Sequence, residues 1–344
     1  MLLDLSFIQI QEYVEKIGLP KFRGEQIFDA MYSGKALEEI SNLSKALKEI
    51  IKNDYPDIKI LKKLESKDGT KKYIISFHDG EIVECVLMSY KYGYTLCLST
   101  QVGCRMGCKF CASTLNGLKR NLSAGEILGQ VLAINRDLGG SSKERKITNI
   151  VLMGSGEPLD NYDNVCKFIE LVSSSRGLNV SQRNISLSTC GLVDKINMLA
   201  EKNYNITLTI SLHATTDEKR REIMPIANRY TIKEIVNACR SYFYKTGRRI
   251  YFEYTLIKGV NDSDEDVDRL VKLLKGLTCH VNVIPLNSVK ERNLIGTTRL
   301  YAYKFAESLN AKKVSATVRR TMGEDIEGAC GQLRNKMLKE GGAN

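Results

Sequence analysis

From about residue 95 onward, the sequence alternates short runs typical of β-strands with longer runs typical of α-helices. The short runs are rich in β-branched and aromatic residues, whereas the longer runs repeat apolar residues at helical spacing. A strand that is followed by a helix and a further strand normally joins a parallel sheet through a crossover, so this pattern predicts an α/β fold. Six strands are fewer than a closed eight-stranded barrel needs, and we therefore expect an open, partial (β/α)6 barrel. The predicted strands are YTLCLST, ITNIVLMG, NISLSTCG, ITLTISLHA, RIYFEYTLI and HVNVIPLN.

The chain on either side of this alternation has a different character. Residues 1–57 show helical periodicity and predict a small accessory domain. Residues 58–92 contain three strand-like runs, separated by the turn sequences SKDGT and HDGE, and predict a β-meander linker. We expect the partial barrel to occupy residues 93–310 and a C-terminal extension to follow over residues 311–344.

The charge of the chain favours a nucleic acid as partner. Lysine and arginine outnumber aspartate and glutamate by 51 to 40, which gives a net charge of +11 over 344 residues. Phosphate neutralisation is the commonest use of such an excess, although a solvated lysine-rich surface would give the same count. No apolar run is long enough to span a bilayer, and the N-terminus lacks the basic region of a signal peptide. We therefore expect a cytoplasmic protein that binds no membrane.

The chain has ten cysteines, which in a cytoplasmic protein indicate metal binding or catalysis rather than disulfides. Cys104, Cys108 and Cys111 form a cluster with the spacing C-x3-C-x2-C. A structural zinc site takes four protein ligands, so His213, His280 or a distant cysteine would have to complete one. An iron–sulfur cubane bound by three thiolates leaves one iron open to a substrate. Zinc is not excluded by the cysteines alone, but their spacing resembles the fingerprint of the radical S-adenosylmethionine (SAM) superfamily.

Polar motifs follow the carboxyl ends of several predicted strands: CRMGCKFC, GSGEP, Ser188, the SLH run at 211–213, and Asn287. In β/α barrels the loops at that end carry the active site, so these motifs should meet at one mouth. The glycines of GSGEP allow the backbone to approach a ligand closely, and Glu157 can accept a hydrogen bond from an ammonium group. An ordinary strand-to-helix turn is the alternative.

Extended motifs resemble those of one radical SAM family, the RlmN-type adenosine C2 methyltransferases, which are related to the Cfr-type C8 enzymes. The resemblance implies methylation of C2 of adenosine 2503 in 23S rRNA, and of C2 of adenosine 37 in tRNAs. Cfr-like methylation of C8 of the same adenosine is the alternative. With the resemblance we expect that residues 1–57 bind RNA, that flavodoxin or ferredoxin supplies electrons, and that the enzyme is a monomer. The motifs are TLCLSTQVGCRMGCKFCASTLNGLKRNLSAGEI, MGSGEPLDNYDN, SLSTCG, ISLHA, MPIANRY, FEYTLIKGVND, HVNVIPLN and DIEGACGQLR.

The resemblance also implies roles for individual residues. The three clustered cysteines would bind a [4Fe–4S] cluster, whose open iron would bind SAM. Cys330 would be methylated on sulfur, Cys97 would be the second reactive cysteine, and Glu84 would accept a proton. Two SAM molecules would be used per turnover, one as methyl donor and one as the source of a 5′-deoxyadenosyl radical. The further SAM-binding residues would be Gly156, Glu157, Ser188, Ser211, Leu212, His213 and Asn287.

Several of these features have simpler explanations. Glu84 shares a strand face with apolar residues and could be an edge-strand glutamate that reaches solvent. His213 could be a hydrogen-bonded core histidine. Cys190 stands where many relatives have serine, and we expect this difference to be silent. The basic runs are most simply solvated faces, although those near the mouth could bind phosphates; they are Lys119-Arg120, Lys219-Arg220-Arg221, Arg248-Arg249 and Arg319-Arg320.

Two other classes of function share the cysteine spacing or the charge. A radical activase that acts on a protein partner would use the same cluster, but it gives no reason for Cys97 and Cys330. A non-catalytic, zinc-bound RNA-binding module would account for the charge and the three cysteines. It would contain zinc rather than iron and sulfide, which an anaerobic metal analysis separates.

Overall fold

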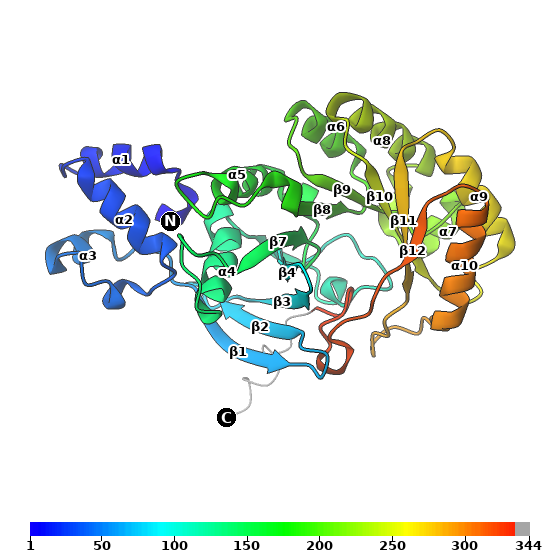
Figure 1. Cartoon of the computed structure of the whole chain (residues 1–344), viewed down its shortest axis with the longest axis horizontal. Helices are drawn as coiled ribbons and strands as arrows, with labels where there is room; N and C mark the ends of the chain where they lie inside the picture. Colours follow the sequence, from blue (N-terminus) through cyan, green and yellow to red (C-terminus); the bar gives the residue numbers. More distant parts are fainter. Residues whose placement is uncertain (334–344) are drawn as a thin grey trace.

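The computed structural model describes residues 1–333, and a ten-stranded sheet lies at the centre of the molecule (Figure 1). The strand order is β1-β2-β3-β4-β7-β8-β9-β10-β11-β12, and every neighbouring pair from β4 to β12 is parallel. All six predicted barrel strands are present. The first and last strands of the order, β1 and β12, do not pair with each other, so the sheet does not close on itself. The open (β/α)6 barrel is therefore confirmed. Its strands are β4 (Gly93–Cys97), β7 (Ile147–Leu152), β8 (Ile185–Thr189), β9 (Thr207–Ser211), β10 (Ile250–Leu256) and β11 (Cys279–Pro285).

One further parallel strand was not predicted. β12 (Ala316–Val318) pairs with β11 at the edge of the barrel, within the residues that we assigned to the C-terminal extension. It has only three residues, which is too short for an alternating pattern to be recognised in the sequence.

Helices cover the outer face of the curved sheet and connect its parallel strands (Figure 1). Three of them begin at a capping box, in which Ser123, Thr231 or Ser263 exchanges hydrogen bonds with the acidic residue three positions later. These bonds satisfy backbone N–H groups of the first turn and so fix where each helix begins. None of the helices within residues 1–333 is both long and apolar enough to cross a bilayer. The barrel helices are α4 (Ala124–Asp137), α5 (Tyr162–Ser173), α6 (Val193–Glu201), α7 (Asp217–Ile223), α8 (Ile232–Thr246), α9 (Asp264–Leu274) and α10 (Arg299–Ala311).

The predicted meander precedes the barrel and extends its sheet. β1 (Lys59–Glu65), β2 (Lys71–Ser76) and β3 (Ile82–Tyr90) are antiparallel, and β3 also pairs with β4. Because β3 has a neighbouring strand on each side, it is not an edge strand. Glu84 on β3 is only 3% exposed. The alternative of an edge-strand glutamate that reaches solvent is therefore wrong.

Three helices precede the meander, namely α1 (Phe7–Lys16), α2 (Phe22–Tyr32) and α3 (Lys45–Ile51). The segments that flank them contact α4 at two glycines one helical turn apart. The backbone N–H of Gly125 donates to Asp4 Oδ1 at 2.7 Å, and a Cβ on Gly129 would lie 1.9 Å from Ile58 Cδ1. Small residues on this face of α4 thus let the N-terminal segments approach the helix closely.

Residues 319–333 run back from β12 across the sheet toward the meander and the barrel mouth (Figure 1). The backbone N–H of Gly323 donates to Asp68 Oδ2 at 2.9 Å, in the β1–β2 turn. Farther along, Gln332 Nε2 donates to the carbonyl oxygen of Ser288 at 3.0 Å, in the loop after β11. These bonds at each end place the residues between them over the mouth of the barrel.

Candidate active site

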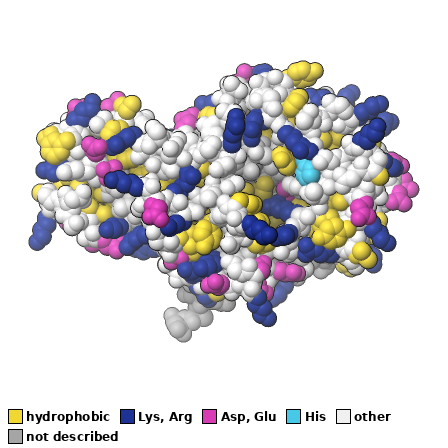
Figure 2. Space-filling model, viewed as in Figure 1, with side chains coloured by type: hydrophobic (Ala, Val, Ile, Leu, Met, Phe, Trp, Pro, Cys, Tyr) yellow, Lys and Arg dark blue, Asp and Glu magenta, His cyan; other side chains and the backbone are white. Residues whose placement is uncertain are grey.

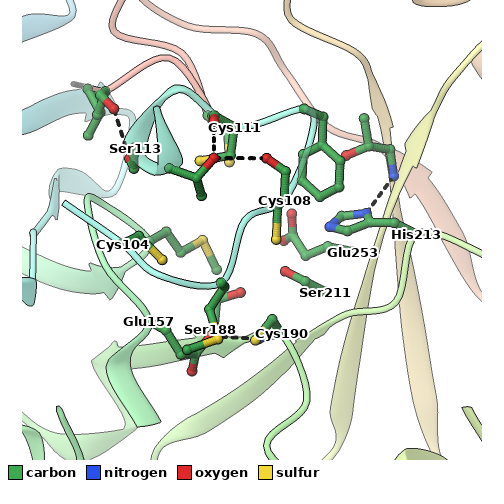
Figure 3. Close-up of a pocket in the computed structure, with 18 of the residues that line it drawn as sticks. Cys104, Cys108, Cys111, Ser113, Glu157, Ser188, Cys190, Ser211, His213 and Glu253 are labelled. Atoms are coloured by element: carbon green, nitrogen blue, oxygen red, sulfur yellow. Dashed lines mark hydrogen bonds between the residues drawn. The ribbon is translucent and has the colours of Figure 1, made fainter. Parts of the chain in front are cut away.

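The three clustered cysteines lie on a loop that is closed by a short hairpin, which was not predicted. β5 (Gln101–Gly103) and β6 (Leu118–Asn121) pair at the two ends of the loop. Within the loop, Thr114 Oγ1 donates to the carbonyl oxygens of Cys108 at 3.1 Å and Cys111 at 2.9 Å. Because the loop is held in this way, its three cysteines line one pocket at the carboxyl ends of the parallel strands (Figure 3).

The geometry does not favour a single zinc ion. Within residues 1–333, no group of three or more His, Cys, Asp or Glu side chains is close enough to hold one metal ion. His213 uses Nδ1 to accept the backbone N–H of Thr255 at 3.0 Å. His280 is hydrogen bonded through both ring nitrogens, at 2.9 Å and 2.8 Å, to hydroxyls near β12. Neither histidine therefore completes a four-ligand zinc site with the cysteines.

Three thiols on one loop instead have the donor chemistry of a [4Fe–4S] cluster, in which each thiolate binds a different iron. Burial raises the pKa of Cys108 well above its usual value, and the neighbouring Cys111 and Cys104 raise it further. Burial also raises the pKa of Cys104 to about 12. Three such thiols lose their protons readily only to metal ions, so the site has the chemistry of a metal-thiolate centre.

The GSGEP turn after β7 forms one wall of the pocket. Gly156 has φ +105°, and a Cβ there would lie 2.6 Å from Cβ of Gln101, so only glycine fits. The Glu157 side chain faces the pocket, where its Oε1 accepts the N–H of Leu159 at 3.0 Å and its Oε2 accepts the N–H of Cys190 at 2.8 Å (Figure 3). Burial raises the pKa of Glu157, and these hydrogen bonds oppose the shift. The carboxylate is thus fixed in position, with lone pairs left for a ligand.

Ser188, Ser211 and His213 line the pocket from the ends of β8 and β9 (Figure 3). His213 has φ +55°, and its ring meets the Phe110 ring edge-on, with centroids 4.7 Å apart. Burial lowers the pKa of His213 to about 3, and Arg220 contributes to the shift. Because Nδ1 accepts a backbone N–H, the neutral imidazole carries its proton on Nε2. The histidine is thus both hydrogen bonded in the core, as the simpler explanation held, and part of the pocket.

Leu212 differs from its neighbours in the predicted set. Its side chain is fully buried in the hydrophobic core and does not line the pocket. Only its backbone takes part, since the carbonyl oxygen accepts a hydrogen bond from Arg220 Nε at 3.1 Å. Leu212 can therefore contact a ligand only through its main chain.

The two remaining predicted cysteines lie beside each other on the side of the pocket next to the meander. Cys330 lines the pocket of the clustered cysteines and also a second pocket, which Cys97 lines from β4. Asn287 lines both pockets and donates from Nδ2 to the carbonyl oxygen of Cys330 at 3.0 Å. Burial, and then the nearby Cys330, raises the pKa of Cys97 to about 12.

Glu84 lies apart from both pockets. On β3 it forms an ion pair with Lys72, with Nζ 3.2 Å from Oε1, and both side chains are at most 5% exposed. Lys72 Nζ also donates to the carbonyl oxygen of Glu327 at 3.3 Å, three residues before Cys330. Two residues beyond Glu84, Val86 packs against Cys97. The structure thus brings Glu84 near the thiols but not into the pocket of the clustered cysteines.

The solvated-face interpretation of the basic runs is wrong for Arg220. Its side chain has 0% exposure, and Nη2 donates to the carbonyl oxygens of Cys190 at 2.6 Å and Ser211 at 3.2 Å. Its Nη1 has no hydrogen-bond partner among residues 1–333. The sequence held one signal that we did not use: Arg220 lies three residues before Ile223, on the buried face of α7.

A second arginine from a basic run, Arg319, lines the second pocket together with Cys97 and Cys330. Arg319 Nη1 lies 2.9 Å from each carboxylate oxygen of Glu253 on β10. Glu253 is 3% exposed and lines the pocket of the clustered cysteines. The sequence held a signal that we did not use, because Glu253 is the one charged residue in the strand Ile250–Leu256. The solvated-face interpretation is therefore also wrong for Arg319, whose side chain is 27% exposed.

Comparison with known proteins identifies close relatives. The model of the radical SAM superfamily matches residues 98–274. A Clostridium perfringens protein named "Probable dual-specificity RNA methyltransferase RlmN" is 53% identical, over 99% of this chain and 98% of its own length. A protein of the same name from Clostridioides difficile is 49% identical, over 95% of each chain. The crystal structure of a radical SAM methyltransferase from Sphaerobacter thermophilus has a TM-score of 0.92 at 40% identity, and the match covers 97% of this chain and 98% of that one.

Proposed function

Because the chain belongs to the radical SAM superfamily and, within it, to the RlmN family of RNA methyltransferases, we propose that it methylates C2 of adenosine 2503 in 23S rRNA. We propose C2 of adenosine 37 in tRNAs as a second substrate, which the dual-specificity names of its relatives support. The observation that carries the proposal is the position of Cys330, which lines both the pocket of the clustered cysteines and that of Cys97. A thiol in that place can receive a group on one side and deliver it on the other.

The chemistry explains why two further cysteines are needed. C2 of adenine is an electron-poor aromatic carbon, so it does not attack a sulfonium methyl group directly. When bound, the [4Fe–4S] cluster and two SAM molecules would supply one methyl group and one 5′-deoxyadenosyl radical per turnover. Cys330 would carry the methyl group on sulfur until a hydrogen atom is removed from it and its carbon adds to C2. After loss of the C2 proton, the Cys97 thiolate would attack the sulfur of Cys330 and break its bond to the transferred carbon, which would take up a proton to become the methyl group. The electron left over when the disulfide forms would return to the cluster, which supplied one electron for the cleavage of SAM.

We assign the loss of the C2 proton to Glu84. Its ion pair with Lys72 stabilises the carboxylate form, which is the form that accepts a proton. The placement of Glu84 two residues from Val86, which packs against Cys97, supports a role at the thiol side of the site. Lys72 was not singled out from the sequence, and it would hold Glu84 in place.

The polar groups that line the pocket have the chemistry to hold SAM. Glu157 would accept hydrogen bonds from its ammonium group, and His213 would donate from Nε2. Leu212 would contribute only its backbone. The pocket places these groups beside the clustered cysteines, where the open iron would need a ligand. The other residues proposed to contact SAM are Gly156, Ser188, Ser211 and Asn287.

We further propose a cytoplasmic monomer that receives electrons from flavodoxin or ferredoxin. Residues 1–57 would bind RNA as an accessory domain. Lysine and arginine side chains are spread over the face shown in Figure 2 rather than gathered in one patch, which is compatible with contacts to a large folded RNA.

The test is to map the methyl group. The anaerobically reconstituted enzyme would be incubated with SAM, reductant and a 23S rRNA fragment, and the digested nucleosides analysed by mass spectrometry. We expect 2-methyladenosine from the wild type and none from Cys330→Ala. The appearance of 8-methyladenosine would contradict C2 selectivity and favour the Cfr-like alternative. Absence of any methyladenosine with a cluster-loaded enzyme would contradict both.

A further inference from the structure

Two tyrosines stack at the tip of the β3–β4 hairpin. The rings of Tyr90 and Tyr92 have centroids 5.0 Å apart and planes only 6° from parallel. Tyr92 is 63% exposed, so Tyr90 covers one face of its ring and leaves most of the remainder to solvent. The tip is held close to β7, because a Cβ on Gly93 would lie 2.5 Å from Cγ2 of Thr148. An exposed aromatic surface of this kind on a fixed hairpin contributes little to the core.

The hairpin tip adjoins the reactive thiols. Tyr90 lines the second pocket together with Cys97 and Cys330. The exposed ring of Tyr92 is stacked on Tyr90 and therefore lies just outside that pocket. A molecule that contacts Tyr92 can thus extend through the second pocket to Cys330.

The free charge around this pocket is positive. Arg320 lines the pocket and is exposed, and it has no ion pair with any residue from 1 to 333. Lys91, between the two tyrosines, is exposed and equally free of ion pairs within that range. The charge of Arg319 is already balanced by Glu253. None of the described residues that line the pocket is acidic.

We propose that Tyr90 and Tyr92 form a stacking platform for an unpaired nucleotide next to the target adenosine, with Arg320 and Lys91 contacting its phosphates. This inference rests on the proposed function and names the part of the RNA that the thiol side recognises. Every base has a π-face, so an exposed aromatic ring binds unstacked bases with little dependence on sequence. A base that is already stacked in a duplex cannot use the platform, so the platform would select RNA in which the neighbour of the target adenosine is unpaired.

The experiment compares binding of two RNAs by fluorescence anisotropy, one with an unpaired adenosine loop and one fully paired. For Tyr92→Ala we expect about tenfold weaker binding of the loop RNA, in line with the loss of one base–aromatic stack, and no change for the duplex. Tyr92→Phe keeps the ring and should bind as the wild type does. Tyr244→Ala is the matched control, because Tyr244 on α8 is 87% exposed and lies outside both pockets. Arg320→Gln should make the slope of log binding constant against log salt concentration for the loop RNA shallower by about one, which corresponds to the loss of one phosphate contact.

The outcomes separate this proposal from the proposed function. A control measures the methylation of Cys330 by SAM in the absence of RNA. A Tyr92→Ala enzyme that is folded should methylate Cys330 as the wild type does, whereas a misfolded one should not. Unchanged loop binding by Tyr92→Ala, or equal loss on loop and duplex, would overturn the platform even if the wild type makes 2-methyladenosine. Loop binding that depends on Tyr92, in an enzyme that forms no methyladenosine, would keep the platform and overturn the proposed reaction.

Discussion

Two arginines lie near different parts of the site, Arg220 fully buried and Arg319 27% exposed, and their charges are compensated in different ways. On the cofactor side, next to the clustered cysteines, the hydrogen bonds of Arg220 go to backbone carbonyl oxygens at the ends of β8 and β9. Burial lowers its pKa. On the thiol side, Arg319 is paired with the carboxylate of Glu253, which raises the pKa of the arginine. Of these two, Arg220 is the one whose buried positive charge has no carboxylate hydrogen-bonded to it among residues 1–333.

The different partners of the two arginines match the charges of the groups proposed to lie beside each of them. Ligated thiolates are negative, and the charge of Arg220 opposes the burial-driven rise in the pKa of Cys108. A cation that is already buried can stabilise them without reorganisation. On the thiol side, the proposed mechanism has Cys330 react with a cation and then with a neutral base, and a balanced Arg319–Glu253 pair adds no net charge near it. Under the proposed mechanism, the partners of each arginine therefore suit the charges that form beside it.

The largest expected effect is on the cofactor side. Cys108→Ala removes one of the three thiolates, so the anaerobically purified variant should lose the cluster and all RNA methylation. The wild type should be brown, with about four iron and four sulfide per chain by chemical analysis. Cys166→Ala, a buried cysteine on α5 away from the pocket, is the control and should keep its iron. Stoichiometric zinc in an active wild type would refute the iron assignment.

The next effect is on the thiol side, where we propose that the two cysteines have different tasks. Cys330→Ala removes the methyl carrier, so neither methylated protein nor methylated RNA should form. Cys97→Ala keeps the carrier but lacks the thiol that releases the product. The base should therefore stay bound to Cys330 through a methylene bridge, as a covalent protein–RNA species on a denaturing gel. Normal turnover by Cys97→Ala, or an equal adduct with Cys330→Ala, would refute this division of tasks.

Much of the cofactor side could be predicted from the sequence because its residues follow strand ends. The alternation of strands and helices predicted the sheet, and a parallel sheet brings its carboxyl ends to one edge. This reasoning placed the cysteine loop, Glu157, Ser188 and His213 together, and the structure does bring them into one pocket. The same reasoning also included Leu212 among the pocket residues, but the side chain of Leu212 points into the core. Neighbouring side chains in an extended chain point to opposite faces, so Leu212 points away from the pocket that Ser211 and His213 line.

The buried ion pairs could not be predicted, because each depends on residues that are distant in sequence. Lys72 and Glu84 meet only once β2 and β3 are in register, and Arg319 reaches Glu253 only across β11. A run of basic residues looks solvated when it is judged by composition. Arg220 shows that the phase of a short helix can turn one member of such a run inward.

A smaller effect tests the comparison of the arginines directly. Arg319→Met leaves the carboxylate of Glu253 buried without its counter-charge, and we expect the free energy of unfolding to fall by about 3 kcal/mol. The double variant Arg319→Met/Glu253→Gln should recover most of that loss, because no unpaired ion is left. Urea unfolding of the apo-protein measures both values.

Arg220→Met provides the contrast. It removes the guanidinium donor from three backbone carbonyl oxygens, of which that of Leu212 keeps the N–H of Ala214 at 2.8 Å, and should also cost about 3 kcal/mol. Adding Glu253→Gln should not restore stability here, because the carboxylate is not the partner of Arg220. Equal rescue of both arginine variants by Glu253→Gln would show that one charge network spans the pocket, and the distinction between its two sides would fail.

The smallest expected effect concerns Cys190, whose backbone joins the groups of the cofactor side. Its N–H donates to Glu157 at 2.8 Å, its carbonyl oxygen accepts from Arg220 at 2.6 Å, and its side chain faces Glu157 (Figure 3).

Cys190→Ser keeps both backbone bonds and replaces the thiol by a hydroxyl that can donate to the same carboxylate. We therefore expect the affinity for SAM, measured by equilibrium dialysis with the cluster-loaded protein, to stay within about twofold of the wild type. Cys190→Val is close in volume but cannot donate, and it should weaken binding about fivefold because it removes the donor group that faces Glu157. Should serine weaken binding as much as valine does, the thiol itself would be required, and the difference from relatives with serine at this position would not be silent.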